Sequence, residues 1–321
     1  MFNKPAEVIK HAAELLNRYS KGNKNFPESQ LKGADLSCAQ LRGINLKFSN
    51  LDRAVLFKAN LTSAILIGVS LKGADLVNSK LILANLEQAQ MRSANLYGAD
   101  ITNGNLQSAN LTKASIENGI LFKANLEQAN LSKADLSNTI LCQANLKSAN
   151  LQSALLFRAN LIHADLTHAD LTHADFTEAD LEGANLKKVN LRGAKLNYVN
   201  LYRANLLGTN LIESNLLGSN LTEADLFGVN LSNANLCNTN LSYVDLRESN
   251  LTGAKMSNAD FTGANLFGAN ISNANLQGAN LSGVNLYRSK LIGTNFQGAT
   301  YDEHTAFPPR FDPKVQGMSE N

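Results

Sequence analysis

The sequence predicts an all-β solenoid, and the pattern of residues 31–301 carries that prediction. Every fifth residue in this stretch is large and apolar, from Leu31 to Tyr301, without an insertion or deletion. The residue two positions before each of them is small, usually Ala, with Ile44 as the one bulky exception, and the residue between is usually Asn or Asp. A helix repeats its faces every 3.6 residues and a strand every 2, so a period of five fits neither. Such regularity is typical of a solenoid whose units pack against their neighbours.

The period of five predicts a chain that turns a corner after each unit and directs one large and one small residue inward. In a continuous α-helix the apolar series would advance about 140° per unit and could not share one core. Four corners close a square, so residues twenty apart stack, and successive coils lie about 4.8 Å apart, the spacing of hydrogen-bonded strands. The small residue leaves room for the large one at native packing density.

Two recurrent residue types predict the conformation of the corners. Gly occurs repeatedly two residues after the apolar one, as at Gly33 and Gly73, where a corner with φ > 0 would favour it. Asn and Asp suit the outward position before the apolar residue, because a short polar side chain there can hydrogen-bond to nearby backbone.

The units at 34–38, 124–128 and 264–268 (ADLSC, ANLEQ and ANLFG) resemble the A(D/N)LXX unit of the pentapeptide-repeat family. This resemblance implies a right-handed quadrilateral β-helix, with the central Leu and the small residue inside, and it implies no chemistry. With twenty residues per coil, we expect about 13 coils. The resemblance also implies a binding or structural role. A few members of the family resemble duplex DNA and inhibit type II topoisomerases.

Three parts are predicted: an N-terminal helical cap at 1–25, the β-helix at 26–301, and a C-terminal cap or tail at 302–321. Asn3 and Pro5 suit the start of a helix over residues 4–21, and Phe26 falls in phase with the repeats. The helix would cover the edge of the first coil, or alternatively bind a membrane surface or a partner. Its apolar stripe consists of Val8, Ile9, Ala12, Leu15, Leu16 and Tyr19.

The C-terminal tail leaves the period of five. Pro308, Pro309 and Pro313 cannot continue a hydrogen-bonded ladder, because proline has no N–H. We expect Phe307 and Phe311 to cover the last coil. The alternative is an end that forms a homodimer, so the chain is predicted to be a monomer or an end-to-end homodimer.

Composition excludes several classes of function. The formal net charge is +2, so no global excess of charge indicates a partner. No stretch reaches 18 apolar residues and no secretory h-region is present, which predicts a cytoplasmic protein without a membrane span. The cysteines, Cys38, Cys142 and Cys237, are too far apart for disulfides and indicate a reducing compartment.

The outward positions predict two candidate surfaces. An apolar patch on the face of Leu81 and Leu121 is a candidate partner surface, and it comprises Ile82, Leu83, Ile120, Phe122, Ile140 and Ile162. A column of cations on the face of Leu51 and Leu71 is a candidate anion-facing column, and it comprises Arg53, Lys72, Arg92, Lys113 and Lys133. The alternative is that these are solvated Lys and Arg side chains that splay apart.

A further outward series lies in the C-terminal half of the chain. It comprises Leu207, Phe227, Phe267 and Tyr287, with Arg247 and Arg288 among them. Stacking of like residues between neighbouring strands stabilises a sheet by a few tenths to about 1 kcal/mol per pair, so a purely structural role is an alternative to a binding role.

The histidines do not predict a metal site. His163, His168 and His173 recur every five residues, which places them on three sides of the square. Asp165 to Asp180 likewise form a ring of charge without a cleft. Motifs for nucleotide, metal or nucleophile chemistry are absent from the sequence. We therefore expect no enzyme activity, no cofactor and no small-molecule substrate.

Three functions remain open. The first is an interaction scaffold that binds a protein partner through its outer faces. The second is a DNA-mimicking regulator of a type II topoisomerase, which would need a denser negative surface than this sequence supplies. The third is a nucleic-acid binder that uses the cation column, although that face lacks aromatic residues for base stacking.

Overall fold

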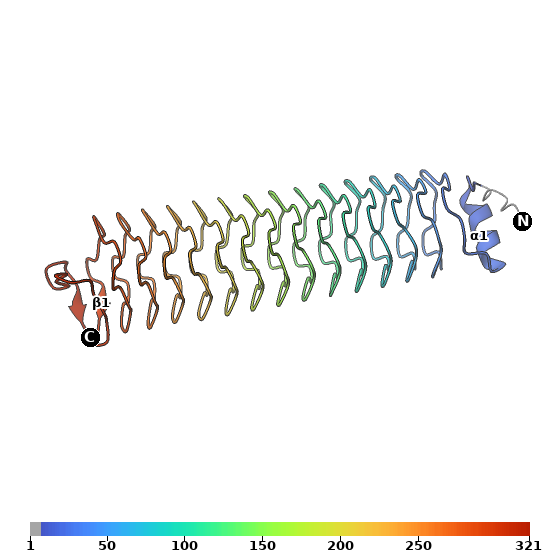
Figure 1. Cartoon of the computed structure of the whole chain (residues 1–321). Coiled ribbons are helices and arrows are strands. Elements are labelled where there is room, and N and C mark those ends of the chain that lie inside the picture. Colours follow the sequence, from blue (N-terminus) through green and yellow to red (C-terminus); the bar gives the residue numbers. More distant parts are fainter. Residues whose placement is uncertain (1–7) are drawn as a thin grey trace, which may run out of the picture. The chain divides into compact units, whose positions relative to one another are not determined.

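The computed structural model describes residues 8–321, and the chain divides into two compact units, Met1–Leu155 and Leu156–Asn321. Stacked coils build each unit (Figure 1). The helix and strands are α1 (Ala12–Ser20) in the first unit, and β1 (Thr300–Tyr301) and β2 (Ser319–Glu320) in the second. Elsewhere each side of a coil contributes one bridging residue to a parallel ladder.

The ladder confirms the predicted coil length of twenty residues in both units. In the first unit, parallel bridges run from Asn25↔Asn45 to Asp135↔Leu155. In the second unit, they begin at Asn160↔Asp180 and keep the same separation as far as Asn280↔Thr300. The total of about 13 coils stays a prediction, because the ladder is described within each unit separately.

The apolar series fills the interior of each unit, as the sequence predicts. Leu126 in the first unit and Leu226 in the second are both 0% exposed, and so are Ala124 and Ala234 at the small inward position. Where Thr replaces Ala, its hydroxyl donates to buried backbone, as Thr139 Oγ1 does to Leu136 O over 2.6 Å. The hydroxyls of Thr209, Thr239 and Thr294 donate instead to a carbonyl of the preceding coil. Among the described residues, the inward Ser79 hydroxyl is buried without a hydrogen-bond partner.

The corners are β-turns with a positive φ at their second central residue. The N–H of Ala34 donates to the carbonyl of Leu31 over 3.0 Å, and Gly33 has φ +66°. Non-glycine residues take the same conformation, for example Lys113 at φ +59°. A positive φ at this position defines a type II turn. Hydrogen bonds to both neighbouring coils hold non-glycine residues in this conformation, although a positive φ costs them about 1 kcal/mol.

Asn and Asp at the bridging positions hydrogen-bond as predicted. Their side-chain oxygens accept the N–H two residues on, as Asn125 Oδ1 accepts that of Glu127 over 3.2 Å. Their amides also form a ladder between coils, in which Asn105 donates to Asn85 over 3.2 Å and Asn145 to Asn125 over 3.0 Å. The side chain that shapes a corner thus also connects successive coils.

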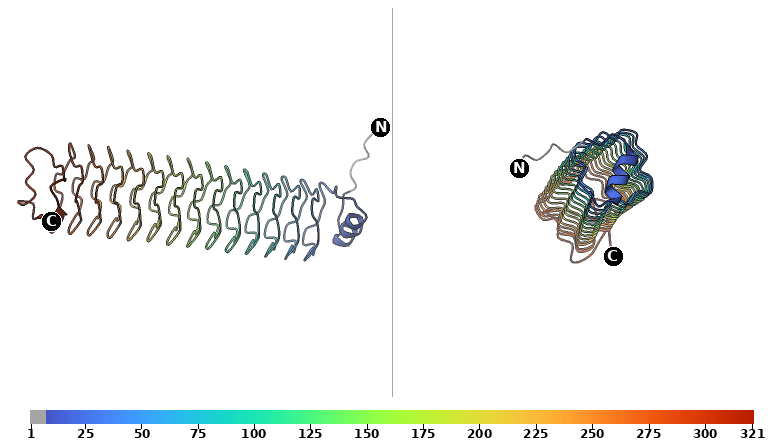
Figure 2. Two further views of the ribbon diagram at one scale, coloured as in Figure 1. Left: turned by 90° about the horizontal axis from the view of Figure 1, so that it is seen from below. Right: turned by 90° about the vertical axis from the view of Figure 1, so that its right-hand side faces the viewer.

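The N-terminal helix is shorter than the sequence predicts. It begins at Ala12, whereas residues 1–7, including Asn3 and Pro5, lie outside the described residues. Ile9 is not helical, because its carbonyl accepts the N–H of Gln30 over 2.8 Å and so joins the ladder. Leu15 is buried, and Tyr19 Oη donates to Arg42 O over 2.8 Å, which places α1 against the first coils (Figure 2).

The tail of the second unit folds against the last coil. Phe311 packs edge-on against Phe296 with ring centroids 5.4 Å apart, and Phe307 packs against Tyr301 at 5.5 Å. Strands β1 and β2 pair in parallel, with Thr300 opposite Ser319. Within the described part of the chain, no helix has the length and apolar character needed to cross a membrane.

Candidate functional site

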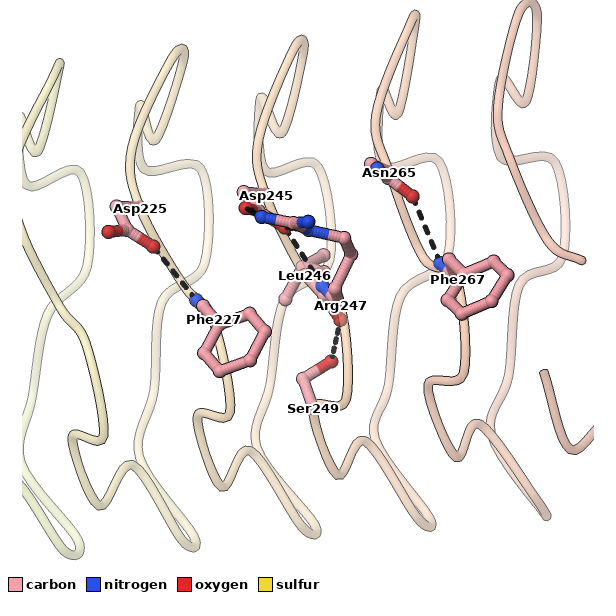
Figure 3. Close-up of polar contacts among 8 residues, drawn as sticks. All are labelled: Asp225, Phe227, Asp245, Leu246, Arg247, Ser249, Asn265 and Phe267. Atoms are coloured by element: carbon pink, nitrogen blue, oxygen red, sulfur yellow. Dashed lines mark hydrogen bonds and ion pairs between the residues drawn. The ribbon is translucent and has the colours of Figure 1, made fainter. Parts of the chain in front are cut away.

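Five residues in successive coils of the second unit form the aromatic–arginine column (Leu207, Phe227, Arg247, Phe267 and Tyr287). Each follows a buried Leu and takes the first central position of a turn. Backbone hydrogen bonds place them in adjacent coils. The N–H of Gly228, which follows Phe227, donates to Arg247 O over 3.0 Å, and the N–H of Gly268, which follows Phe267, donates to Tyr287 O over 3.1 Å. Figure 3 shows Phe227, Arg247 and Phe267 in three consecutive coils.

The bridging residues fix the backbone of this column. Asp225 Oδ1 accepts the N–H of Phe227, and Asn265 Oδ1 accepts that of Phe267, both over 3.1 Å (Figure 3). The first turn residue therefore leaves the coil in the same direction each time. A repeating turn with a repeating side-chain acceptor aligns the side chains into a column.

The side chains of the column contact one another and remain accessible. The Phe267 and Tyr287 rings lie 6.2 Å apart, and the Arg247 guanidinium lies 5.5 Å from the centre of the Phe227 ring. Arg288 lies over Phe267 at 5.6 Å. Phe227 is 38% exposed and Tyr287 is 44% exposed. Aromatic and cation–π contacts of this kind order side chains that would otherwise be mobile.

Arg247 is oriented by Asp245. Its Nη2 lies 2.6 Å from Asp245 Oδ2 and its Nε lies 2.9 Å from Asp245 Oδ1, a two-pronged contact (Figure 3). The Arg247 hydrogen bond holds the pKa of the Asp245 carboxyl below its ordinary value, against the opposing effect of partial burial. The same bond raises the pKa of Arg247. The guanidinium is therefore pre-oriented before any partner arrives.

Glycine borders the column on one side. Leu207, Phe227 and Phe267 are each followed by Gly at the second turn position. At Gly228, where φ is +63°, an added Cβ would meet nothing within 4 Å. At Gly268, beside Phe267, an added Cβ would instead overlap the Glu248 carboxylate, so a side chain of the preceding coil already lies there. The column presents aromatic faces that a partner surface can reach.

The repeat family follows from the match of the sequence to the family described as "Pentapeptide repeats (8 copies)". Overlapping matches cover residues 34–228 and 230–300. The chain belongs to the pentapeptide-repeat family. Members of this family form right-handed quadrilateral β-helices, in agreement with the coil length of twenty residues.

Solved pentapeptide-repeat structures resemble the chain. HetL, a pentapeptide repeat protein involved in heterocyst differentiation regulation in the cyanobacterium Nostoc sp. strain PCC 7120, is 35% identical over 68% of this chain and 96% of HetL, with a TM-score of 0.54. The protein alr5209 of Nostoc PCC 7120 is 34% identical over 32% of this chain and 84% of its own, with a TM-score of 0.32. Rfr23 of Cyanothece 51142 is 29% identical over 40% and 90%, with a TM-score of 0.31. No curated protein matches the chain significantly.

The predicted apolar patch is divided in this pentapeptide-repeat structure. Ile120 and Ile140 are bridge partners in the first unit, and Phe122 follows the same side of the coil. Thr102 lies in the coil between Ile82 and Phe122, since Leu83 N donates to Thr102 O. The described first-unit residues therefore form two clusters, Ile82 with Leu83 and Ile120 with Phe122 and Ile140. Ile162 belongs to the second unit, after the buried Leu161.

The prediction of a single cation column is wrong. Arg53, Lys113 and Lys133 take the second turn position, with φ between 57° and 59°, whereas Lys72 and Arg92 take the first. The register joins each second-position N–H to the first-position carbonyl of the next coil, as Arg53 N donates to Lys72 O over 3.0 Å. The five cations thus occupy two neighbouring columns on one face, here called the basic face. All five are exposed.

The histidines take the second turn position on three sides of their coils. His163, His168 and His173 have φ of 55°, 62° and 59°, and all are exposed. Among residues 8–321, no three His, Cys, Asp or Glu side chains gather into a group that could hold a metal ion. The Asp245–Arg247 contact is the feature of the site that sequence reasoning missed. Its spacing of two residues across a buried Leu is the signal that could have identified it.

Proposed function

We propose that this pentapeptide-repeat chain is a non-enzymatic interaction scaffold that binds a protein partner through the outer faces of its coils. The observation that carries the proposal is the aromatic–arginine column, in which Phe227 lies beside a pre-oriented Arg247 and both Phe227 and Tyr287 stay exposed. Aromatic residues and Arg are enriched at the centres of protein interfaces and dominate their binding energy. The aromatic side chains have few rotatable bonds and Arg247 is already held by Asp245, so ordering them on binding costs little conformational entropy.

A second contact in the first unit supports the same function. Ile140 is 41% exposed and pairs with Ile120, beside Phe122, over which the Lys123 ammonium lies at 5.1 Å. Ile82 and Leu83, the latter 57% exposed, and Ile162 in the second unit remain proposed contact residues. Apolar side chains grouped on an exposed face favour an interface over solvent exposure.

The column is tested by pull-down from the native cell with Phe227→Ser plus Phe267→Ser. We expect partners retained by the wild-type chain to be lost, while the melting temperature stays within a few degrees. The matched control is Phe157→Ser plus Tyr202→Ser, which removes two aromatic residues that also contact arginines but lie on other columns. An unchanged partner list with the column variant, or equal loss with the control, would contradict the proposed location.

Binding of a polyanion by the basic face is a second candidate function. Among the described residues, the side chains of Arg53, Lys72, Arg92, Lys113 and Lys133 have no carboxylate within ion-pair distance. Exposed cations grouped on one face attract nucleic acid or an acidic protein surface. Salt-dependent binding of duplex DNA that requires these residues is the measurement that tests it.

The remaining parts of the proposal concern the ends of the chain and its location. We propose that residues 1–25 and 302–321 act as caps, a role supported by the contacts of Tyr19 with Arg42 and of Phe311 with Phe296. Cys38 and Cys237 are thiols outside any disulfide, which supports a reducing compartment such as the cytoplasm.

A further inference from the structure

We propose that the last coil of the second unit binds an extended segment of a partner protein along the edge formed by residues 289–293. The segment adds one more side to the ladder and carries an acidic residue followed by a large aliphatic one. This site is separate from the aromatic–arginine column, and its partner segment is recognised mainly through backbone hydrogen bonds.

The tail pairs with two sides of the last coil. Leu286 N donates to Ala306 O over 2.7 Å, and Ala306 N donates to Val284 O over 2.8 Å. On another side, Ser319 N donates to Ala299 O over 2.9 Å. These contacts cover the edges near residues 284–286 and 298–301, but the tail does not pair with the side between them.

Three backbone groups on that side are left without partners. The preceding coil engages one edge of it, since Ile271 N donates to Lys290 O over 3.0 Å and Asn273 N to Ile292 O over 2.8 Å. The opposite edge presents the carbonyl of Ser289 and the N–H groups of Leu291 and Gly293. Within residues 8–321, none of these three groups has a hydrogen-bond partner. An open edge of this kind is a template for strand addition.

The tail cannot fill this edge itself. The segment opposite contains Pro308 and Pro309, which lack an N–H, and Arg310, whose φ is +68°. It instead leaves an open pocket of about 290 Å³ lined by Leu291, Ile292, Phe311 and the segment 308–310. Leu291 is partly exposed, unlike Leu281 and Leu286 at 0%, and Ile292 is 79% exposed. An aliphatic side chain stacked on Leu291 would restore the burial found in every earlier coil.

Charge specifies the residue that precedes the aliphatic one. Lys290 occupies a bridging position. Lys195 occupies the same position in an earlier coil, and its Nζ lies 3.2 Å from Oδ2 of its bridge partner Asp175, so a Lys at this position can pair with an Asp in the neighbouring coil. Lys290 is exposed, and Arg310 also borders the pocket. An Asp paired with Lys290 places the next residue above Leu291, so the fitting segment reads acidic, then aliphatic. A neutral or basic segment lacks this complementarity.

The experiment measures binding of a fluorescein-labelled peptide with the sequence of residues 223–230 (Glu-Ala-Asp-Leu-Phe-Gly-Val-Asn) to the full chain by fluorescence anisotropy. We expect saturable binding that weakens at least fivefold with Lys290→Glu. The matched control is Lys255→Glu, which makes the same charge change at an exposed bridging position whose two neighbouring coils are present. We expect it to leave the affinity unchanged.

Peptide variants test the two recognised side chains. Asp225→Lys and Leu226→Asp in the peptide should each weaken binding at least fivefold. Absence of saturation at millimolar peptide, or equal effects of Lys290→Glu and Lys255→Glu, overturns the proposal. A dimer in light scattering that Ile292→Asp converts to a monomer would mean that a second copy occupies the edge, which also overturns it. None of these outcomes depends on the column variants.

Discussion

The two units have interiors of the same composition and differ in their exteriors. The first unit contains 17 Lys and Arg against 11 Asp and Glu, a net charge of +6, and the second contains 12 against 16, a net charge of −4. In the second unit, cations pair with carboxylates one coil away, as Arg158 does with Glu178 and Arg203 with Glu223, both at 2.7 Å. The cations of the basic face in the first unit have no such partners among the described residues.

This difference separates what the fold requires from what it permits. Both interiors consist mostly of Leu and small residues, and the exceptions, such as Phe176 and Phe261, are apolar and 0% exposed, because a narrow square must be filled without voids or clashes. An exposed ion pair contributes only about 0.2–1 kcal/mol, so neither charge pattern is needed for folding. The exteriors are therefore free to differ, and the proposed binding surfaces rest on these differences.

The largest expected effect tests whether the Leu series points inward in both units. Leu136→Asp in the first unit and Leu226→Asp in the second should each lower the free energy of unfolding by about 4 kcal/mol or more, because they bury a carboxylate and lose a packed side chain. Chemical denaturation followed by circular dichroism measures this. Ser137→Asp, at the neighbouring outward position, should stay within about 0.5 kcal/mol. Equal melting of Leu136→Asp and Ser137→Asp would contradict the inward assignment.

The next effect tests whether the exterior of the first unit is functional. If the basic face binds nucleic acid, Arg92→Glu plus Lys113→Glu should weaken binding of duplex DNA about tenfold or more. The slope of the logarithm of the binding constant against the logarithm of the salt concentration should fall by about two, because two phosphate contacts are lost. The control is Arg192→Glu plus Arg203→Glu, because these arginines are ion-paired in the second unit. Titrations at several salt concentrations measure both. Equal losses would remove the distinction between the two exteriors.

A smaller effect concerns the Asp245–Arg247 pair of the second unit. Since its pKa is lowered in the folded state, Asp245 contributes stability that is present above its ordinary pKa and is lost as pH falls through the lowered value. Asp245→Asn should therefore cost under about 1 kcal/mol at pH 7 and less under acid conditions. Urea denaturation at pH values from 2 to 7 measures this. In an Arg247→Ala background the cost should shrink, and an unchanged cost there would contradict the pairing.

The smallest effect sharpens the comparison of corners within the second unit. Gly218→Ala should destabilise the chain more than Gly228→Ala, because a Cβ at Gly218 would lie 2.6 Å from the Tyr198 ring whereas one at Gly228 meets nothing. Both carry a positive φ, which costs about 1 kcal/mol. The exposed ring can move aside, so the extra cost should be a few tenths of a kcal/mol. Thermal denaturation in a Tyr198→Ala background should equalise the two, and a persisting difference would contradict the contact.

Sequence reasoning predicted the interior and the corners but not every pairing outside. The stacking of Phe227, Phe267 and Tyr287 follows from counting twenty residues. The separation of Arg53 from Lys72 follows from the same count, because the two residues are nineteen apart and therefore take different turn positions. The start of α1 at Ala12 was also mispredicted, since Ile9 pairs with Gln30 instead of continuing the helix.

By itself the sequence determined the coil, because a strict period of five large and small residues allows one way to bury them all. It also determined the corners, where Asn or Asp and a residue of positive φ act within their own turn. Only the tertiary structure decided which outward groups meet and which stay unpaired, such as the Arg247 guanidinium with the Phe227 ring and the N–H groups of Leu291 and Gly293. Those outcomes depend on neighbouring coils and on the path of the tail, which a local pattern does not encode.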